Sequence, residues 1–370
     1  GIAQLLTRRG LLQLESQFFT LTNSTVVRAR ILNGRPVRTA LRGLGPETIL
    51  RFGQPNYLFD LAQAAADPAR ITPAVATAAA VPARGDPAQY ALGKLRLGEA
   101  HTLATGERVL VAVIDSGIDA DHPELAGAIA GSYDALGKGG PPHRHGTAIA
   151  GAIAAHARLM GAAPTARILA IRAFDSAGGS AQATTMAILK GVEYAVLQQA
   201  RIINMSFAGA SDPALARQLA VAKLKDIVLI AASGNFGPKS PPQYPSSDPN
   251  VIAVSATDAD DRLFRASNIG PHIALAAPGV DILLPEPGNE YRLISGTSFS
   301  AAYVSGVAAL VLQRAPGLKP DGVREVLQKT ARDIGPAGKD SQFGAGLVDA
   351  YQAIMALQAP TAAADPTARR

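Results

Sequence analysis

The chain has no cysteine, which excludes disulfide bonds, thiol nucleophiles and zinc sites built from cysteine. It has no run of about 18 uncharged apolar residues, so we expect no segment that spans a membrane. No basic run alternates with aromatic residues, and the net charge of +6 is spread thinly, which argues against a nucleic-acid surface. Aromatic residues make up only 5% of the chain, so we expect a core of closely packed Ala, Val, Ile and Leu.

The sequence also lacks an initiator methionine and the pattern of a signal peptide. We interpret its 370 residues as a fragment of a longer precursor, long enough for one large domain with an accessory unit.

Three segments lie outside the main part of the chain, which is residues 91–357. In residues 1–57, short patterns predict the order helix, strand, strand, helix, strand, which is a ferredoxin-like α+β unit without its first strand. Residues 58–90 are rich in Ala and Pro and predict an extended, exposed linker. Residues 358–370 predict an unstructured tail.

Residues 91–357 alternate between short apolar runs and helical stretches. Continuous apolar strands separated by helices predict an α/β fold, with a mostly parallel sheet covered by helices on both faces. In such sheets the loops at the carboxyl ends of the strands carry the functional site. The predicted strands are RVLVAVID, ARILAIRAF, RIINMSF, DIVLIAAS, NVIAVSAT and HIALAAPG.

Three polar side chains stand where apolar strands end or helices begin. Asp115 ends the run VLVAVID, His145 opens the small-residue stretch HGTAIAGAIAA, and Ser298 opens an apolar helix. Each has an ordinary interpretation, namely a turn cap, a structural histidine and a helix N-cap. Together they supply what nucleophilic catalysis by serine needs, because the hydroxyl needs a base and the base needs an orienting group. The amino end of a buried helix also suits a reaction that generates an oxyanion.

Asn235 follows a fourth apolar strand, in the sequence AASGNFG. Its ordinary interpretation is a turn residue, because Asn tolerates left-handed backbone. Its amide is also able to donate to an oxyanion beside the Ser298 N–H. A nucleotide-binding fold is the competing α/β hypothesis, but IDSGIDADHP offers one glycine and three acids where a phosphate loop would lie.

The blocks VAVIDSGIDADHPEL, HGTAIAGAIAA, NMSFAGA, AASGNFG and GTSFSAAYVSGVAAL resemble those of subtilisin-like serine proteases, in order and spacing, over about residues 91–357. The resemblance implies a three-layer α/β fold and a serine endopeptidase that needs no cofactor for catalysis. It implies that Asp115 orients His145, that His145 is the base, and that Ser298 is the nucleophile. Asn235 and the Ser298 N–H would form the oxyanion hole. The alternative is a catalytically inactive binding protein with the same fold.

The resemblance further implies that an extended substrate pairs with two edge segments. The residues concerned are Gly178, Gly179 and Ser180 in one segment, and Ser206, Phe207, Ala208 and Gly209 in the other. Ala208 stands where the family usually has glycine, and Phe236 beside Asn235 is not acidic. We therefore predict cleavage after apolar side chains of small to medium size.

Residues 1–57 resemble the inhibitory prosegment of exported subtilisins, whose last strand, here FGQPNYLF, ends in the cleft. This implies self-cleavage between about Tyr57 and Gln89, and an exported, monomeric protein that binds polypeptide substrates and its own prosegment. Subtilisins often hold structural calcium, and the acidic turn Asp258, Asp260 and Asp261 is a candidate site. An ordinary surface turn is the competing interpretation, and we assign no calcium ligand.

Overall fold

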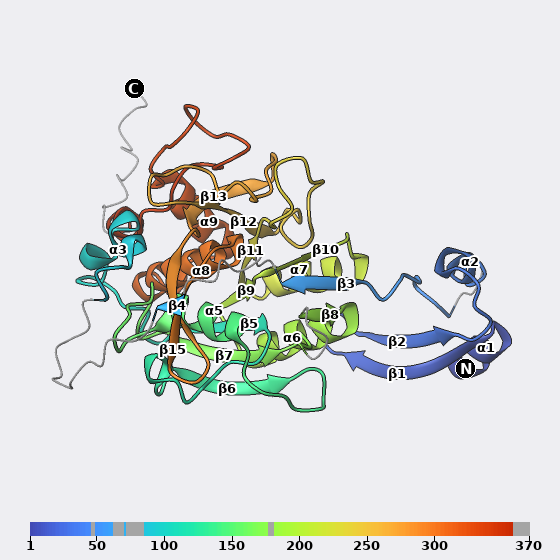
Figure 1. Ribbon diagram of the computed structural model, residues 1–370. Helices are drawn as coiled ribbons and strands as arrows, with labels where there is room; N and C mark the ends of the chain where they lie inside the picture. The colour runs from blue at the N-terminus through green and yellow to red at the C-terminus, as the bar shows by residue number, and fades with distance from the viewer. Residues whose placement is uncertain (46–48, 62–69, 72–84, 177–180, 358–370) are drawn as a thin grey trace, which may run out of the picture.

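The structure, a computed structural model, describes residues 1–45, 49–61, 70–71, 85–176 and 181–357. It contains a large α/β unit and a small N-terminal unit that projects from one end of the large one (Figure 1). Among the described helices, none is long and apolar enough to cross a membrane.

The large unit is built on a seven-stranded sheet in which all neighbouring strands are parallel, in the order β13-β12-β11-β9-β5-β7-β6. Six strands match the six apolar runs, which confirms the predicted α/β sheet. The seventh, β6, is an edge strand with no fully buried residue, so no apolar run reveals it. The strands are β5 (Leu110–Asp115), β6 (Ile129–Asp134), β7 (Arg167–Arg172), β9 (Ile202–Met205), β11 (Val228–Ala232), β12 (Val251–Thr257) and β13 (Ile273–Pro278).

Helices cover both faces of this sheet. One face carries α5 (Arg144–Ala154) and α8 (Thr297–Arg314), and the other carries α6 (Thr185–Leu197) and α7 (Pro213–Leu224). The alternation along β5 explains this arrangement, because Val111 and Val113 share a core with α5 and α8, whereas Ala112 and Ile114 share one with α6 and α7. The remaining helices of the large unit are α3 (Tyr90–Lys94), α4 (Leu97–Ala100), η1 (Pro123–Leu125), α9 (Pro320–Lys329) and α10 (Ala350–Met355).

The small residues of α5 and α8 are required by close contacts. A Cβ atom on Gly306 of α8 would lie 2.5 Å from the Cβ of Ala162. A Cβ atom on Gly151 of α5 would lie 2.3 Å from the Cγ of Pro285. Such separations are far below van der Waals contact, so only glycine lets the two helices lie this close to their neighbours. This packing brings the amino ends of both helices to the carboxyl edge of the sheet.

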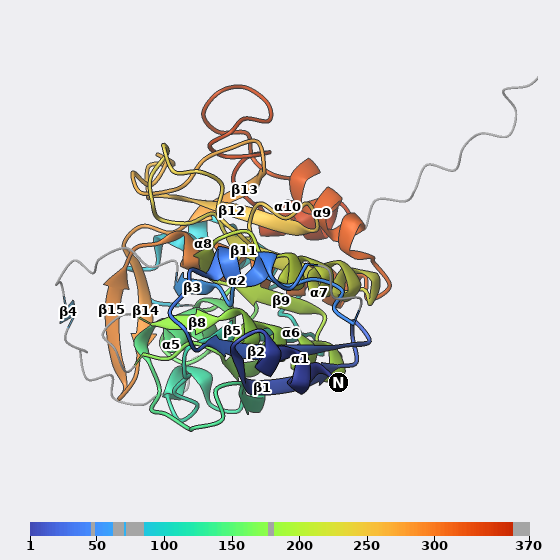
Figure 2. The ribbon, with the colours of Figure 1, turned by 90° about the vertical axis from the view of Figure 1, so that its right-hand side faces the viewer.

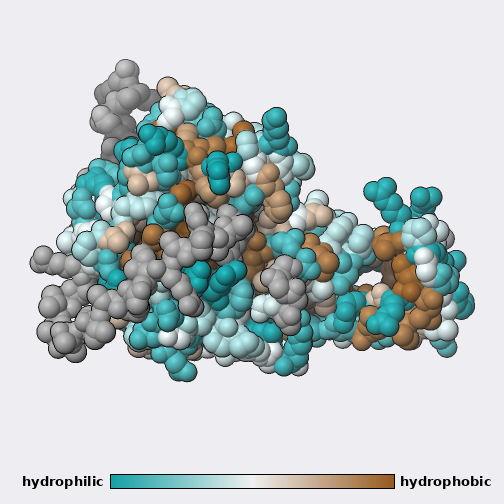
Figure 3. Space-filling view, viewed as in Figure 1, coloured by the Kyte–Doolittle hydropathy of each residue, from teal (hydrophilic) through white to brown (hydrophobic). Residues whose placement is uncertain are grey.

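The N-terminal unit has its first four elements in the predicted order: α1 (Ile2–Arg8), β1 (Leu11–Phe19), β2 (Ser24–Ile31) and α2 (Val37–Arg42). β1 and β2 form an antiparallel hairpin whose turn contacts α6, so the hairpin stands in front of α6 in Figure 2. A cavity of about 1310 Å³ separates the hairpin, α1 and α2 from the helices α6 and α7. Apolar side chains gather around this hollow (Figure 3).

The last predicted strand of this unit is shorter than expected and lies elsewhere. β3 (Leu58–Leu61) runs antiparallel between β10 (Phe207–Gly209) and β8 (Gln182–Thr184) of the large unit. The β1–β2 sheet therefore has two strands among the described residues, and the prediction of a ferredoxin-like sheet is wrong in this respect. The backbone groups of β3 find two partner strands on the large unit instead.

The prediction that residues 58–90 form an exposed linker is also wrong where the structure describes them. The side chain of Phe59 is fully buried. The amide of Gln89 bonds to both the backbone N–H and the backbone oxygen of Met160, so the large unit begins before residue 91. A hairpin of β14 (Ile282–Glu286) and β15 (Glu290–Ile294) is extended by β4 (Arg70–Ile71). The predicted tail, 358–370, lies outside the described residues.

Candidate active site

Asp115 and His145 form a buried pair at the carboxyl edge of the sheet. Asp115 is the last residue of β5, and its two carboxylate oxygens lie 2.8 and 2.9 Å from Nδ1 of His145. Both side chains are fully buried. Two further donors, the N–H and the hydroxyl of Ser116, offset the cost of burying the carboxylate. Because a carboxylate only accepts hydrogen bonds, the Nδ1 atom carries the proton and Nε2 is the basic nitrogen of the neutral ring.

The start of α5 holds His145 in place. His143 is the N-cap residue, and its Nδ1 accepts the backbone N–H of His145 at 3.3 Å. Burial lowers the pKa of His143, which keeps that ring neutral and able to accept. A Cβ atom on Gly146 would lie 2.8 Å from the carbonyl oxygen of Ser116, so this glycine lets α5 approach the end of β5. The start of α5 therefore packs closely against the loop that follows Asp115.

Ser298 lies in the first turn of α8 and is fully buried. Its hydroxyl donates to the backbone oxygen of Ser206 at 3.3 Å, and the Ser206 hydroxyl donates to the backbone oxygen of Ser298 at 3.0 Å. Asn204 in turn donates to the Ser206 hydroxyl at 2.9 Å. The ring of Phe299, the next residue of α8, lies 5.8 Å from the ring of His145. The carboxyl ends of β5 and β9 and the amino ends of α5 and α8 therefore meet at one place.

Asn235 is locked onto the same helix start. Its side-chain oxygen accepts the backbone N–H of Thr297 at 3.1 Å and the Thr297 hydroxyl at 2.9 Å. These two bonds fix the orientation of the amide, so its NH₂ group points away from Thr297 as the donor end. The structure thus brings together all four residues that the sequence singled out, Asp115, His145, Ser298 and Asn235.

A second layer of residues was not predicted from the sequence. Asn268 accepts the N–H of Phe236 at 2.9 Å and donates its own N–H to the oxygen of Gly234. Gly234 has φ +108°, and a Cβ atom there would lie 2.7 Å from the Asn268 amide nitrogen. The absence of a side chain at Gly234 therefore lets the Asn235 loop pack closely against Asn268, which is distant in sequence. The hydrogen bonds of Asn268 to Gly234 and Phe236 hold the loop in place. The only sequence signal for this support is the polarity of Thr297 and Asn268.

The predicted substrate-binding residues lie beside this site. Ser206 supports Ser298, and Ala208 lies opposite Asp60 in the pairing of β10 with β3. Phe207 is buried and packs edge-on against Phe59 at 5.8 Å. A Cβ atom on Gly209 would lie 2.5 Å from the ring of Phe59, so glycine makes room for that side chain. The other predicted residues, Gly178, Gly179 and Ser180, lie outside the described residues.

The acidic side chains of the turn Asp258, Asp260 and Asp261 are engaged in other contacts. Asp261 pairs with Lys94 and Arg332, each at 2.9 Å. Asp260 pairs with Arg262 at 2.8 Å, and Asp258 accepts backbone N–H groups of its own turn. Across the described part of the chain, no three acidic or histidine side chains converge as metal ligands do.

The sequence model of the Peptidase S8 family, the subtilase family, matches residues 106–346. Thermitase of Thermoactinomyces vulgaris is 34% identical over 274 residues, which cover 72% of this chain and 95% of thermitase. The thermophilic serine proteinase of Bacillus sp. strain AK1 is 36% identical over 252 residues, 66% of this chain and 61% of that protein.

A solved structure supports the same assignment. Fervidolysin from Fervidobacterium pennivorans, a keratinolytic enzyme related to subtilisin, matches with a TM-score of 0.76 at 25% identity. The match covers 96% of this chain and 59% of fervidolysin. The chain therefore belongs to the subtilase family and is a subtilisin-like serine endopeptidase.

Proposed function

We propose that Asp115, His145 and Ser298 are the catalytic triad of this endopeptidase, with Asn235 and the Ser298 N–H as the oxyanion hole. The observation that carries the proposal is the buried bond pair between the Asp115 carboxylate and Nδ1 of His145, beside the first turn of α8. This arrangement leaves Nε2 as the basic atom and puts the serine among the N–H groups of a helix start.

We expect these residues to carry out acyl transfer in two steps. His145 Nε2 takes the proton of Ser298 as Oγ bonds to the scissile carbonyl carbon, and Asp115 stabilises the imidazolium that forms. The negative oxygen accepts hydrogen bonds from Asn235 Nδ2 and the Ser298 N–H, at the positive end of the α8 dipole. The imidazolium then protonates the leaving amine as the C–N bond breaks. Water repeats the sequence on the acyl-enzyme, and no cofactor takes part.

We further propose that residues 1–57 are a prosegment that inhibits the enzyme until self-cleavage within residues 58–89. β3 supports this, because it lies between β10 and β8 in the antiparallel manner of a bound peptide.

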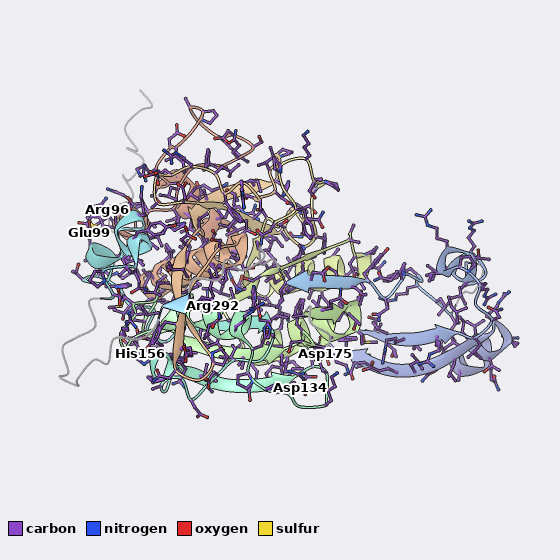
Figure 4. The ribbon with its side chains drawn as sticks, in the orientation of Figure 1. Arg96, Glu99, Asp134, His156, Asp175 and Arg292 are labelled. Atoms are coloured by element: carbon purple, nitrogen blue, oxygen red, sulfur yellow. The ribbon has the colours of Figure 1, made fainter. Side chains whose placement is uncertain are left out.

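Charges on the two units support the same docking. Glu15 of β1 pairs with Lys190 of α6 across the two units, whereas Lys138 and Asp175 of the large unit pair with each other at 2.5 Å. These four side chains line a cleft of about 520 Å³ between the units. Asp175 and Asp134 lie on the side of the large unit that faces the hairpin (Figure 4).

For substrates, we propose polypeptides cleaved after apolar residues of small to medium size. The buried Ala208 supports this, since its methyl group occupies space beside the groove between β8 and β10 in which β3 lies. Phe236 also supports it, because it places no negative charge next to Asn235. A peptide library cut chiefly after Arg or Lys would contradict this preference. We propose an exported, monomeric enzyme, in keeping with the relative named minor extracellular protease Epr of Bacillus subtilis.

A serine-reactive fluorophosphonate tests the catalytic proposal. We expect labelling of Ser298 that disappears in Ser298→Ala and persists in Ser295→Ala, a change three residues away. Absence of labelling in a folded chain whose N-terminal unit has been removed by an added protease would favour an inactive binding protein of the same fold. Mass spectrometry over time tests self-cleavage: the wild-type chain should be cut between Tyr57 and Gln89, and the Ser298→Ala chain should stay intact. Equal cutting of both chains would overturn the zymogen proposal.

A further inference from the structure

The side chain of Gln54 makes two complementary hydrogen bonds to the start of α7. Its Nε2 donates to Oδ1 of Asp212 at 2.8 Å, and its Oε1 accepts the backbone N–H of Ala214 at 2.9 Å. One fixed acceptor and one fixed donor therefore face the two ends of a single primary amide. Gln54 belongs to the segment that leads into β3, whereas both partners belong to the large unit.

Asp212 is built into the fold as a rigid acceptor. It is fully buried, and it receives the N–H groups of Ala214 and Leu215 at 3.0 Å each as the N-cap of α7. The hydroxyl of Thr185, at the start of α6, donates to the other carboxylate oxygen at 2.6 Å. Together with Gln54 these donors surround the carboxylate, which holds its oxygens in fixed directions.

This arrangement discriminates between side chains of equal size. A glutamate in place of Gln54 would put a carboxylate oxygen against the Asp212 carboxylate, and like charges at this distance repel. A methionine has the length of glutamine but neither the donor nor the acceptor, so it would remove both bonds, although the Ala214 N–H still donates to Asp212. Of these three side chains, only the carboxamide of glutamine bonds to both groups.

The contact is continuous with the groove that holds β3. Thr185 links the two, because its hydroxyl oxygen also accepts the N–H of Tyr57 at 3.0 Å, and its N–H donates to the Tyr57 oxygen. Tyr57 directly precedes β3, so a chain anchored by its amide at the α7 start runs straight into pairing with β8 and β10. Upstream, the Phe52 ring lies 4.3 Å from the Arg217 guanidinium.

We propose that Asp212 and the Ala214 N–H form a recognition subsite for a carboxamide side chain, outside the catalytic groove. It selects polypeptides that carry glutamine four residues before the stretch that pairs with β8 and β10. Gln54 occupies the subsite within the uncut chain, and a substrate glutamine takes its place once that segment has left. The last step rests on the proposed self-cleavage, whereas the recognition of Gln54 does not.

The first experiment uses the full chain with Ser298→Ala, so that no cleavage takes place. Hydrogen exchange of the Tyr57 to Leu61 amides measures how firmly the segment is held. We expect Gln54→Glu and Gln54→Met each to speed this exchange at least tenfold at pH 7. Gln17→Glu, which changes an exposed glutamine on β1, should leave it unchanged. Unchanged exchange in Gln54→Glu would overturn the subsite.

The second experiment measures selection by the wild-type protein after self-cleavage. The probes are synthetic peptides with the sequence of residues 50–69, carrying Gln, Glu or Met at the position of Gln54. We expect kcat/KM about tenfold higher for the glutamine peptide, mainly through KM, and a smaller preference over the glutamate peptide in the Asp212→Asn enzyme, which lacks the repelling charge. Equal kcat/KM for the three peptides would overturn substrate selection. If no peptide of any kind is cut, the proposed release of the prosegment after self-cleavage fails, and the exchange experiment alone decides whether the subsite recognises the carboxamide.

Discussion

The carboxylate of Glu193, in α6, accepts the backbone N–H of Thr20 at 2.7 Å, in the turn that joins β1 to β2. It also accepts the N–H of Leu21 at 3.2 Å. Turn N–H groups have no strand partner, and here a carboxylate that is only 8% exposed satisfies two of them from the other unit. This relationship ties the hairpin to the helix layer that covers the sheet.

Replacing Glu193 should therefore loosen the N-terminal unit. We expect Glu193→Ala in the Ser298→Ala chain to weaken docking by about 1.5–3 kcal/mol, the usual worth of hydrogen bonds to a charged group. Hydrogen exchange at Thr20 and Leu21 measures the change. Glu99→Ala is the matched control, because Glu99 lies on α4, on the side of the large unit away from the hairpin (Figure 4). Equal exchange in both variants would show that Glu193 does not hold the hairpin.

Acid should weaken the same docking through Glu15. Burial by itself raises the pKa of this carboxyl, but the hydrogen bond and charge of Lys190 and the charge of Arg28 outweigh it and hold the pKa below its ordinary 4.5. A depressed pKa means that the docked state favours the ionised form. The stabilisation is complete above pH 4.5 and is lost as pH falls through the lowered pKa. Pulsed hydrogen exchange of β1 and β2 should show this acid loss, and Glu15→Gln should reduce its pH dependence.

Changing Asp115 should impair catalysis more than folding. An asparagine amide at this position would donate to Nδ1 of His145 and force the proton onto Nε2, which removes the basic atom that faces the nucleophile. We expect Asp115→Asn to lower kcat by about 10⁴-fold with little change in KM, the size of the effect in another Ser-His-Asp triad. Steady-state kinetics on a chromogenic peptide measures it, on protein whose circular dichroism matches the wild type. A fall of less than about tenfold would remove Asp115 from the proposed triad.

Glu124 should be among the most important polar residues for stability. It is fully buried, and it accepts the N–H groups of Ala157, Arg158 and Leu159 at 2.9–3.0 Å and the Tyr291 hydroxyl at 3.0 Å. Glu124→Ala leaves these donors unsatisfied, so we expect the free energy of unfolding to fall by at least about 3 kcal/mol.

Tyr291→Phe is a milder variant for comparison with Glu124→Ala, because it removes only one of these hydrogen bonds. It should lower the free energy of unfolding by about 1 kcal/mol. Denaturant unfolding of the Ser298→Ala chain measures both variants without self-digestion. If Glu124→Ala cost no more than Tyr291→Phe, the carboxylate would not be the centre of this network.

Some features of this protein follow from local sequence. Each of the six predicted strands is a largely apolar run because each is covered on both faces, including β13 at one edge of the sheet. Asp115, His145 and Asn235 attract attention because each polar residue follows or precedes such a run. β6, at the other edge, escapes prediction because none of its residues is buried, so it has no apolar run.

Other features depend on contacts between distant residues. No local pattern shows that β3 leaves the N-terminal unit, since a strand's partners are chosen by which backbone edges are unpaired nearby. The same holds for Asn268 beside Gly234 and for Glu193 beneath the Thr20 turn.

By itself, then, the sequence determined the parallel sheet, the four residues of the candidate site and their order, because burial and helix starts leave periodic marks on neighbouring residues. The tertiary structure decided where β3 pairs and which group each polar side chain meets. A hydrogen bond such as that between Gln54 and Asp212 joins residues 158 positions apart. Its two partners are selected by distance in space, which no pattern along the chain encodes.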